Sequence, residues 1–194
     1  MCLESSREFA MAKLYKRQAG FTLLEVLIAF MVLSFGLLGA VALQAKAKQA
    51  SFDSMQRAAA VALANDILQR IRVNDSADIV SNYDLTFSSD TDLIPQLRCF
   101  SNDCTSSAIA ALDLEQWKNA IRARENTGTL DDTTVCIDLD ADAQGKGIDV
   151  QVVVAWQGRQ EIKATDAIKG ISCGTNDDKR RLVVLTTFIF ARGV

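Results

Sequence analysis

A single acidic side chain, Glu25, lies inside a predominantly apolar run that extends from Phe21 to Leu43. An ionised carboxylate in hydrocarbon costs about 2.5 to 3.5 kcal/mol unless another group pairs with it, so an acid at such a place is functional by default. The free amine of a neighbouring copy of the chain would be a suitable partner. The sequence therefore indicates that Glu25 is a functional residue that needs a cationic partner.

Four cysteines follow the apolar run, and an even number is typical of disulfides in an exported protein. Four cysteines allow three pairings. Cys99 and Cys104 enclose a short polar turn, whereas Cys136 opens a predicted strand and Cys173 precedes the last one. We therefore expect the disulfides Cys99–Cys104 and Cys136–Cys173. A zinc site is the alternative, but zinc clusters usually contain two closely spaced cysteine pairs, and only one loose pair occurs here.

Alternating acids at Asp138, Asp140 and Asp142 are the one candidate for ion binding, because carboxylates in a loop can supply oxygen ligands to calcium. An EF-hand loop, however, has glycine where Ala143 stands and glutamate where Asp149 stands. A solvated hairpin turn is the favoured interpretation. Calcium remains the alternative, and we assign no metal site.

Catalytic patterns are missing from the sequence. It contains no histidine, which removes the commonest general base and the commonest transition-metal ligand. It contains no P-loop or HExxH pattern, and its one GxSxG match, GISCG at 170–174, has no histidine in the chain to complete a catalytic triad. We expect a protein that is not an enzyme and needs no cofactor.

The apolar run is long enough to cross a membrane. Its 23 residues would form a helix of about 35 Å, compared with about 30 Å for the hydrocarbon core. Lys13, Lys16 and Arg17 precede it, so the positive-inside rule predicts a cytoplasmic N-terminus and an exported C-terminal part. Translation starts either at Met1 or at Met11, which opens a compact basic leader.

Charge argues against general nucleic-acid binding. Residues 1–20 hold four basic and two acidic side chains, so the remainder has 17 basic and 22 acidic groups, a net of −5. A nucleic-acid binder would be expected to present a basic face. No direct nucleic-acid partner is expected.

The junction before the apolar run has a specific resemblance, carried by Gly20, Phe21, Thr22, Leu23, Leu24 and Glu25. These residues resemble the class III signal of type IV pilins and pseudopilins. The resemblance implies that a prepilin peptidase/methyltransferase removes residues 1–20 and methylates the new N-terminus at Phe21. It also implies that Glu25 meets the N-terminal amine of an adjacent subunit and sets the axial register of the assembly.

Further along, SMQRAAAVALANDILQRIRVN and the DLEQW segment resemble the PilV group, the type IV pilus modification proteins. The residues that distinguish this group from generic pilins are mainly Ser54, Arg57, Ala59, Leu63, Arg70, Arg72 and Asn74. Cys104, Asp113, Leu114 and Trp117 extend the resemblance further along the chain. Helical periodicity alone predicts that Arg57, Arg70 and Arg72 are solvated and that Trp117 is a core anchor. A partner-facing role for these arginines rests on the resemblance. The proline that kinks the helix of many major pilins has no counterpart, which argues against the main filament subunit.

Hydrophobic patterning predicts an α+β, pilin-like fold. We expect one helix of about 50 residues from Phe21 to Arg72, with a transmembrane half at 21–43 and an extracytoplasmic half at 44–73. The globular domain at 74–194 would contain a helix at 113–125 with Asp113 as its N-cap. Strands near 134–139, 149–156 and 182–191 would form an antiparallel sheet. Val150, Val152, Val154 and Trp156 alternate with their neighbours, which predicts one sheet face against the long helix. Turn-rich loops are expected at 76–105 and 168–181.

The resemblance implies a minor type IV pilin that takes part in priming pilus assembly and so supports adhesion, twitching motility or DNA uptake. It would sit in the inner membrane with a periplasmic domain, and incorporation into the surface pilus is the further option. Its partners would be other minor pilins, the major pilin and the inner-membrane assembly platform. The alternatives are a minor pseudopilin of a type II secretion system and a tip adhesin or DNA-binding module.

Overall fold

The structure is a computed structural model that describes residues 20–91, 103–143 and 146–190. The chain divides into two compact units, one up to Ala47 and one from Lys48 onward. Helix α1, Leu23–Val73, contributes residues to both units, and no proline interrupts its sequence. The predicted long helix is therefore confirmed, with bounds within two residues of those expected.

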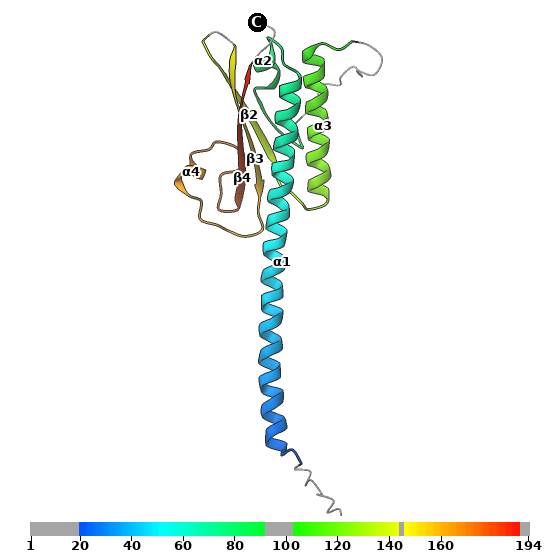
Figure 1. Cartoon of the computed structure of the whole chain (residues 1–194), viewed down its shortest axis with the longest axis vertical. Helices are drawn as coiled ribbons and strands as arrows, with labels where there is room; N and C mark the ends of the chain where they lie inside the picture. Colours follow the sequence, from blue (N-terminus) through cyan, green and yellow to red (C-terminus); the bar gives the residue numbers. More distant parts are fainter. Residues whose placement is uncertain (1–19, 92–102, 144–145, 191–194) are drawn as a thin grey trace, which may run out of the picture. The chain divides into compact units, whose positions relative to one another are not determined.

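The first unit is built from the N-terminal part of α1 (Figure 1). Leucine and alanine, which favour helices, are frequent in it, and from Val26 to Leu43 apolar side chains lie on every side of the helix. This helix is long and apolar enough to cross a membrane, with a mean hydropathy of 2.6 in an 18-residue window of which 0% is buried.

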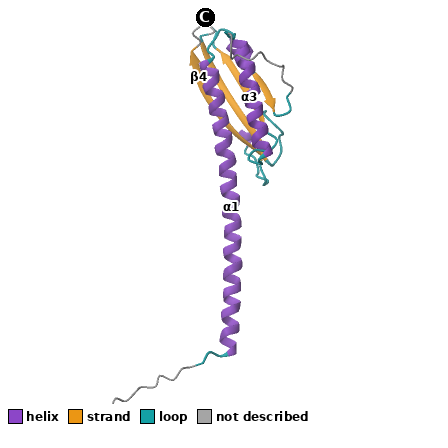
Figure 2. Ribbon diagram, turned by 90° about the vertical axis from the view of Figure 1, so that its right-hand side faces the viewer, coloured by secondary structure: helices purple, strands orange, loops and turns teal. Residues whose placement is uncertain are grey.

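The second unit has two layers, with helices on one face of a four-stranded antiparallel sheet (Figure 2). The sheet order is β1-β2-β3-β4, formed by Leu85–Ser88, Thr134–Ala141, Gly147–Gln157 and Arg180–Phe190. The helices on it are residues 48–73 of α1 and α3, Ser106–Asn126. Two short helices, α2 (Ile79–Tyr83) and α4 (Asp166–Lys169), lie in the connections. This is the predicted pilin-like α+β fold.

The core lies between α1 and the sheet. Along α1 the buried apolar residues recur every three or four positions: Ala60, Leu63, Ala64, Ile67, Leu68 and Ile71. They share one cluster with Val150, Val152, Val154 and Trp156 of β3, so the predicted alternation of β3 is confirmed. On the opposite face of β3, Val153 and Ala155 pack with Cys173 in a second, smaller cluster.

The prediction for α3 was wrong at its N-terminal end. The helix begins at Ser106, and Thr105 is its N-cap, with its hydroxyl accepting a hydrogen bond of 3.2 Å from the amide of Ala108. Asp113 lies in the middle of the helix and is buried. It was mistaken for a cap because its charge is satisfied by residues distant in sequence. The expected loops also contain β1, α2 and the second half of α4.

Cys136 and Cys173 form a disulfide across 37 residues of sequence, which agrees with the predicted pairing. The bond fastens β2 to the segment that precedes β4. Cys104 is also disulfide-bonded. Cys99 lies outside the described residues, so the pairing Cys99–Cys104 stays a prediction.

Replacing both Cys136 and Cys173 by alanine should destabilise the globular unit. Closing a loop of 37 residues limits the unfolded chain, and the chain-entropy model gives about 4 kcal/mol for such a loop. We expect a loss of about 2 to 4 kcal/mol in the free energy of unfolding by urea, followed by tryptophan fluorescence of the full chain in uncharged micelles. An unchanged unfolding midpoint would contradict a stabilising role for this bond.

Candidate functional site

The N-terminal segment begins α1 with a threonine cap. The amide of Glu25 donates to the carbonyl oxygen of Thr22 at 3.1 Å and to its hydroxyl oxygen at 3.2 Å. Threonine followed three residues later by glutamate is the spacing of a capping box. An acid in the first turn is also favoured by the helix dipole. Glu25, which the sequence predicts to act in assembly, therefore also stabilises the first turn of α1.

Gly20 and Phe21 precede the helix and are exposed, with Phe21 82% exposed. The peptide bond between them therefore lies outside regular structure, where a peptidase can reach it. The large apolar side chains of α1 from Leu23 to Leu43 are exposed as well. Within the described residues, the carboxylate of Glu25 forms no hydrogen bond or ion pair. It is available to a group on another molecule.

The acids of the β2–β3 hairpin have a turn-forming role. The two carboxylate oxygens of Asp142 accept hydrogen bonds from the amides of Lys146, at 2.8 Å, and Gly147, at 2.9 Å. Asp138 and Asp140 lie exposed on β2, and Asp140 is paired in register with Asp149. No group of three acidic, cysteine or histidine residues in the described ranges is placed to hold a metal ion. The hairpin interpretation fits this geometry better than calcium binding does.

A polar network joins α1, α2 and α3 of the second unit. Asp113 accepts one hydrogen bond from Arg70, at 2.9 Å, and another from the hydroxyl of Tyr83, at 2.8 Å. The side-chain amide of Asn74 donates to the same hydroxyl at 2.9 Å. Arg70 also forms an ion pair of 3.0 Å with Asp66. Arg70 thus serves contacts within the chain, and sequence reasoning missed this role.

Three further residues of the PilV-like pattern, Trp117, Arg72 and Arg57, each have a different environment. Trp117 is a core anchor, as predicted: it is 1% exposed, and its indole N–H donates to Asp66 at 2.9 Å. Arg72 donates to the hydroxyl of Thr187 at 2.7 Å. Arg57 is exposed. Of the three arginines, only Arg57 makes no hydrogen bond with the described part of the chain.

The network changes the pKa of two of its members. Burial lowers the pKa of Arg70, but its hydrogen bond with Asp113 and the charges of Asp66 and Asp113 outweigh this, so the pKa is raised. Burial raises the pKa of Tyr83 well above its usual range. The hydrogen bond from Asn74 opposes that rise, whereas the bond to Asp113 and its charge add to it. Both side chains are therefore held in their protonated forms.

Comparison with known families agrees with this geometry. Residues 15–41 match the prokaryotic N-terminal methylation motif, and residues 42–115 match the family model of the type IV pilin Tt1218. The two adjacent matches, which together span residues 15–115, show that the chain is similar to type IV pilins. No curated protein and no solved structure matches it significantly.

The two matches bear on several features of this pilin-like chain. The type IV pilin family is structural and non-enzymatic, so the pilin is not an enzyme. The methylation motif implies processing by a prepilin peptidase, and the apolar helix fits a membrane-anchored prepilin. The matched range ends at residue 115 and contains Arg70, Tyr83 and Asp113, so the network lies within the family segment, whereas β2, β3 and β4 follow it.

The raised pKa of Tyr83 predicts alkaline destabilisation of the pilin. Unfolded tyrosine ionises near pH 10, whereas the folded chain keeps the phenolic proton to higher pH. The free energy of unfolding should therefore fall as pH rises above about 10, and Tyr83→Phe should make that fall less steep. Because Tyr15 is the only other tyrosine, tyrosinate absorbance of a Tyr15→Phe chain reports Tyr83 alone. Ionisation of Tyr83 at its ordinary pKa would contradict the prediction.

Proposed function

We propose that this pilin is a minor type IV pilin of the PilV group that takes part in priming pilus assembly and so supports adhesion, twitching motility or DNA uptake. The observation that carries the proposal is the carboxylate of Glu25, which lies without a partner among the described residues on an exposed apolar helix. Such a helix needs lipid or other helices around it, and such a carboxylate needs a cation.

Glu25 is the only charged residue between Phe21 and Leu43. Transfer of each large apolar side chain of this segment from water into lipid contributes about 1.5 to 3 kcal/mol of favourable free energy, so the helix is stable in the membrane. Lipid supplies no partner for the carboxylate. The N-terminal amine of a processed neighbouring subunit is a suitable cationic partner, and this ion pair forms only when subunits come together. Glu25 would therefore favour assembly over the isolated membrane state.

Location and partners follow from the same segment. Lys13, Lys16 and Arg17 favour a cytoplasmic N-terminus and place the globular domain in the periplasm. The Cys136–Cys173 disulfide suits that oxidising compartment. We assign residues 1–20 to a removed leader and residues 21–43 to the membrane half of the helix. The proposed partners are the prepilin peptidase/methyltransferase, other minor pilins, the major pilin and the inner-membrane assembly platform.

A minor rather than a major role is supported by α1 itself. The sequence of α1 contains no proline, so the helix lacks the kink-forming residue of many major pilins. A minor pseudopilin of a type II secretion system would use the same helix and the same acid. The match to a type IV pilin model favours the pilus.

Glu25→Gln should insert and be processed normally but assemble poorly. A charge-assisted hydrogen bond contributes about 1.5 to 3 kcal/mol, so its loss should lower recruitment of other pilins by about tenfold or more. The measurement is the amount of other minor pilins that copurifies with the variant from a strain deleted for the wild-type gene, together with its surface pili.

The matched control is Ser34→Ala, which removes a polar group from the same helix without changing its charge. This variant should recruit partners as the wild type does. If Glu25→Gln restores pili fully, Glu25 is not the assembly group. If the deletion abolishes secretion of folded proteins and leaves pili normal, the pseudopilin alternative replaces the proposal.

A further inference from the structure

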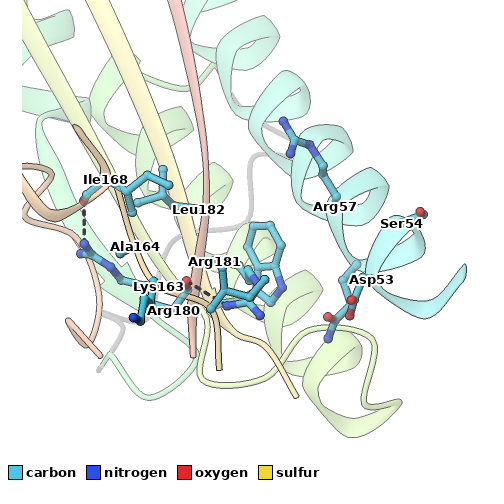
Figure 3. Close-up of a pocket in the computed structure, with 12 residues that line it drawn as sticks. Asp53, Ser54, Arg57, Lys163, Ala164, Ile168, Arg180, Arg181 and Leu182 are labelled. Atoms are coloured by element: carbon cyan, nitrogen blue, oxygen red, sulfur yellow. Dashed lines mark hydrogen bonds between the residues drawn. The ribbon is translucent and has the colours of Figure 1, made fainter. Parts of the chain in front are cut away.

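A cavity of about 370 Å³ in the second unit is lined by α1, the segment that follows β3, and the start of β4 (Figure 3). Arg57, Lys163, Arg180 and Arg181 bring four positive charges to its walls, and Asp53 brings one negative charge, a net of +3. The chain without its leader has a net charge of −5. The cavity is therefore a positive site on an otherwise acidic domain.

Among the described residues, no carboxylate neutralises these cations. None of the four forms an ion pair with any described residue. Arg180, only 6% exposed, donates instead to the backbone carbonyls of Ile168, Ile171 and Cys173 at 2.7, 2.8 and 3.1 Å. Arg181 donates to the carbonyl of Gln160 at 2.6 Å. Carbonyls orient a guanidinium but leave its positive charge in place.

Two residues of the cavity wall also carry buried N–H groups that lack an acceptor. These groups are Nε1 of Trp156 and Nε of Arg180, and neither has a hydrogen-bond partner among the described residues. Trp156 is 4% exposed. An unsatisfied buried donor costs about 1 to 3 kcal/mol. The wall therefore favours a ligand that brings acceptor atoms.

The remaining lining is apolar and includes Ile162, Ile168 and Leu182. An occupant that fits both parts of the wall combines a negative charge with apolar neighbours. We propose that the cavity binds an acidic segment of a partner pilin, with an aspartate or glutamate carboxylate at the cations and flanking apolar side chains against Ile162 and Leu182. This inference rests on the proposed function, which places other pilins beside this one. Three of the four cations lie beyond residue 115, where the family match ends.

The two tryptophans of the chain provide a direct test. The indole N–H of Trp117 already donates to Asp66, whereas that of Trp156 has no acceptor in the described structure. The full chain, isotope-labelled at the indole nitrogens, is titrated in uncharged micelles with a blocked Leu-Glu-Leu peptide and followed by NMR. We expect the Trp156 signal to shift to saturation while the Trp117 signal stays fixed. The blocked Leu-Gln-Leu peptide should bind about tenfold more weakly.

Variants at the rim of the cavity locate the binding. Arg57 and Lys163 are exposed and donate no hydrogen bond to the described residues, so Arg57→Gln combined with Lys163→Gln should leave the fold intact. The loss of two charges should weaken Leu-Glu-Leu binding by about tenfold. Lys146→Gln, on the β2–β3 hairpin, is the matched control and should bind as the wild type does.

Several results would overturn the proposal: no shift of the Trp156 signal, equal affinity for both peptides, or unchanged affinity in the double variant. A response to glycerol phosphate without a response to Leu-Glu-Leu would also overturn it, because the cavity would then be a phosphate site suited to lipid headgroups.

A measurement in the host separates this proposal from the proposed function. The double variant of Arg57 and Lys163, expressed in the deletion strain, should copurify with less of the other minor pilins than the wild type does. Wild-type copurification by the variant would overturn the cavity proposal and leave the proposed function intact. If the wild-type chain itself copurifies with no pilin, the proposed function fails, while the peptide titration still decides what the cavity binds.

Discussion

An apolar helix that carries one carboxylate is stable only where lipid or another helix covers it and a cation reaches the acid. This constraint governs the first unit of the chain, in which the side chains from Leu23 to Leu43 are exposed and Glu25 is the only charged residue among them. Membrane insertion satisfies the apolar side chains but not the acid. The chain is similar to type IV pilins, and an acid that has no partner within the described residues gives a physical reason for the proposed assembly.

The second half of α1, residues 48–73, has a different role, because it packs against the rest of the globular unit. Its buried positions face the sheet and form the core. Arg70 and Asn74, at its C-terminal end, reach Asp113 and Tyr83, so the helix is tied to α2 and α3 by charged and neutral hydrogen bonds. A buried acid is tolerated because donors surround it. The Cys136–Cys173 bond fastens the opposite face of the sheet. These contacts give the domain a defined surface, on which the cationic cavity lies.

Much of the fold could be predicted from local patterns, and the remainder depends on contacts distant in sequence. The long helix and the alternating strand that contains Val152 are visible as periodicities of three to four and of two. The N-cap of α3 was placed wrongly because the partners of Asp113 lie 43 and 30 residues away. Strand β1 has only four residues, too few for a periodic signal. The cap formed by Thr22 could have been found from the T-x-x-E spacing. The cationic cavity could not have been found from the sequence, because its cations come together only in the folded chain.

The central claim is that the chain becomes a subunit whose free N-terminus and Glu25 are able to pair with neighbours. The most direct test is the mass of the mature N-terminus, measured by mass spectrometry on protein from the host. The wild type is compared with Gly20→Val and with a strain that lacks the prepilin peptidase. The account predicts a methylated Phe21 as the first residue in the wild type and an unprocessed chain in the other two cases. A wild-type chain that retains Met1 or Met11, or one cut after Leu43, would contradict the account.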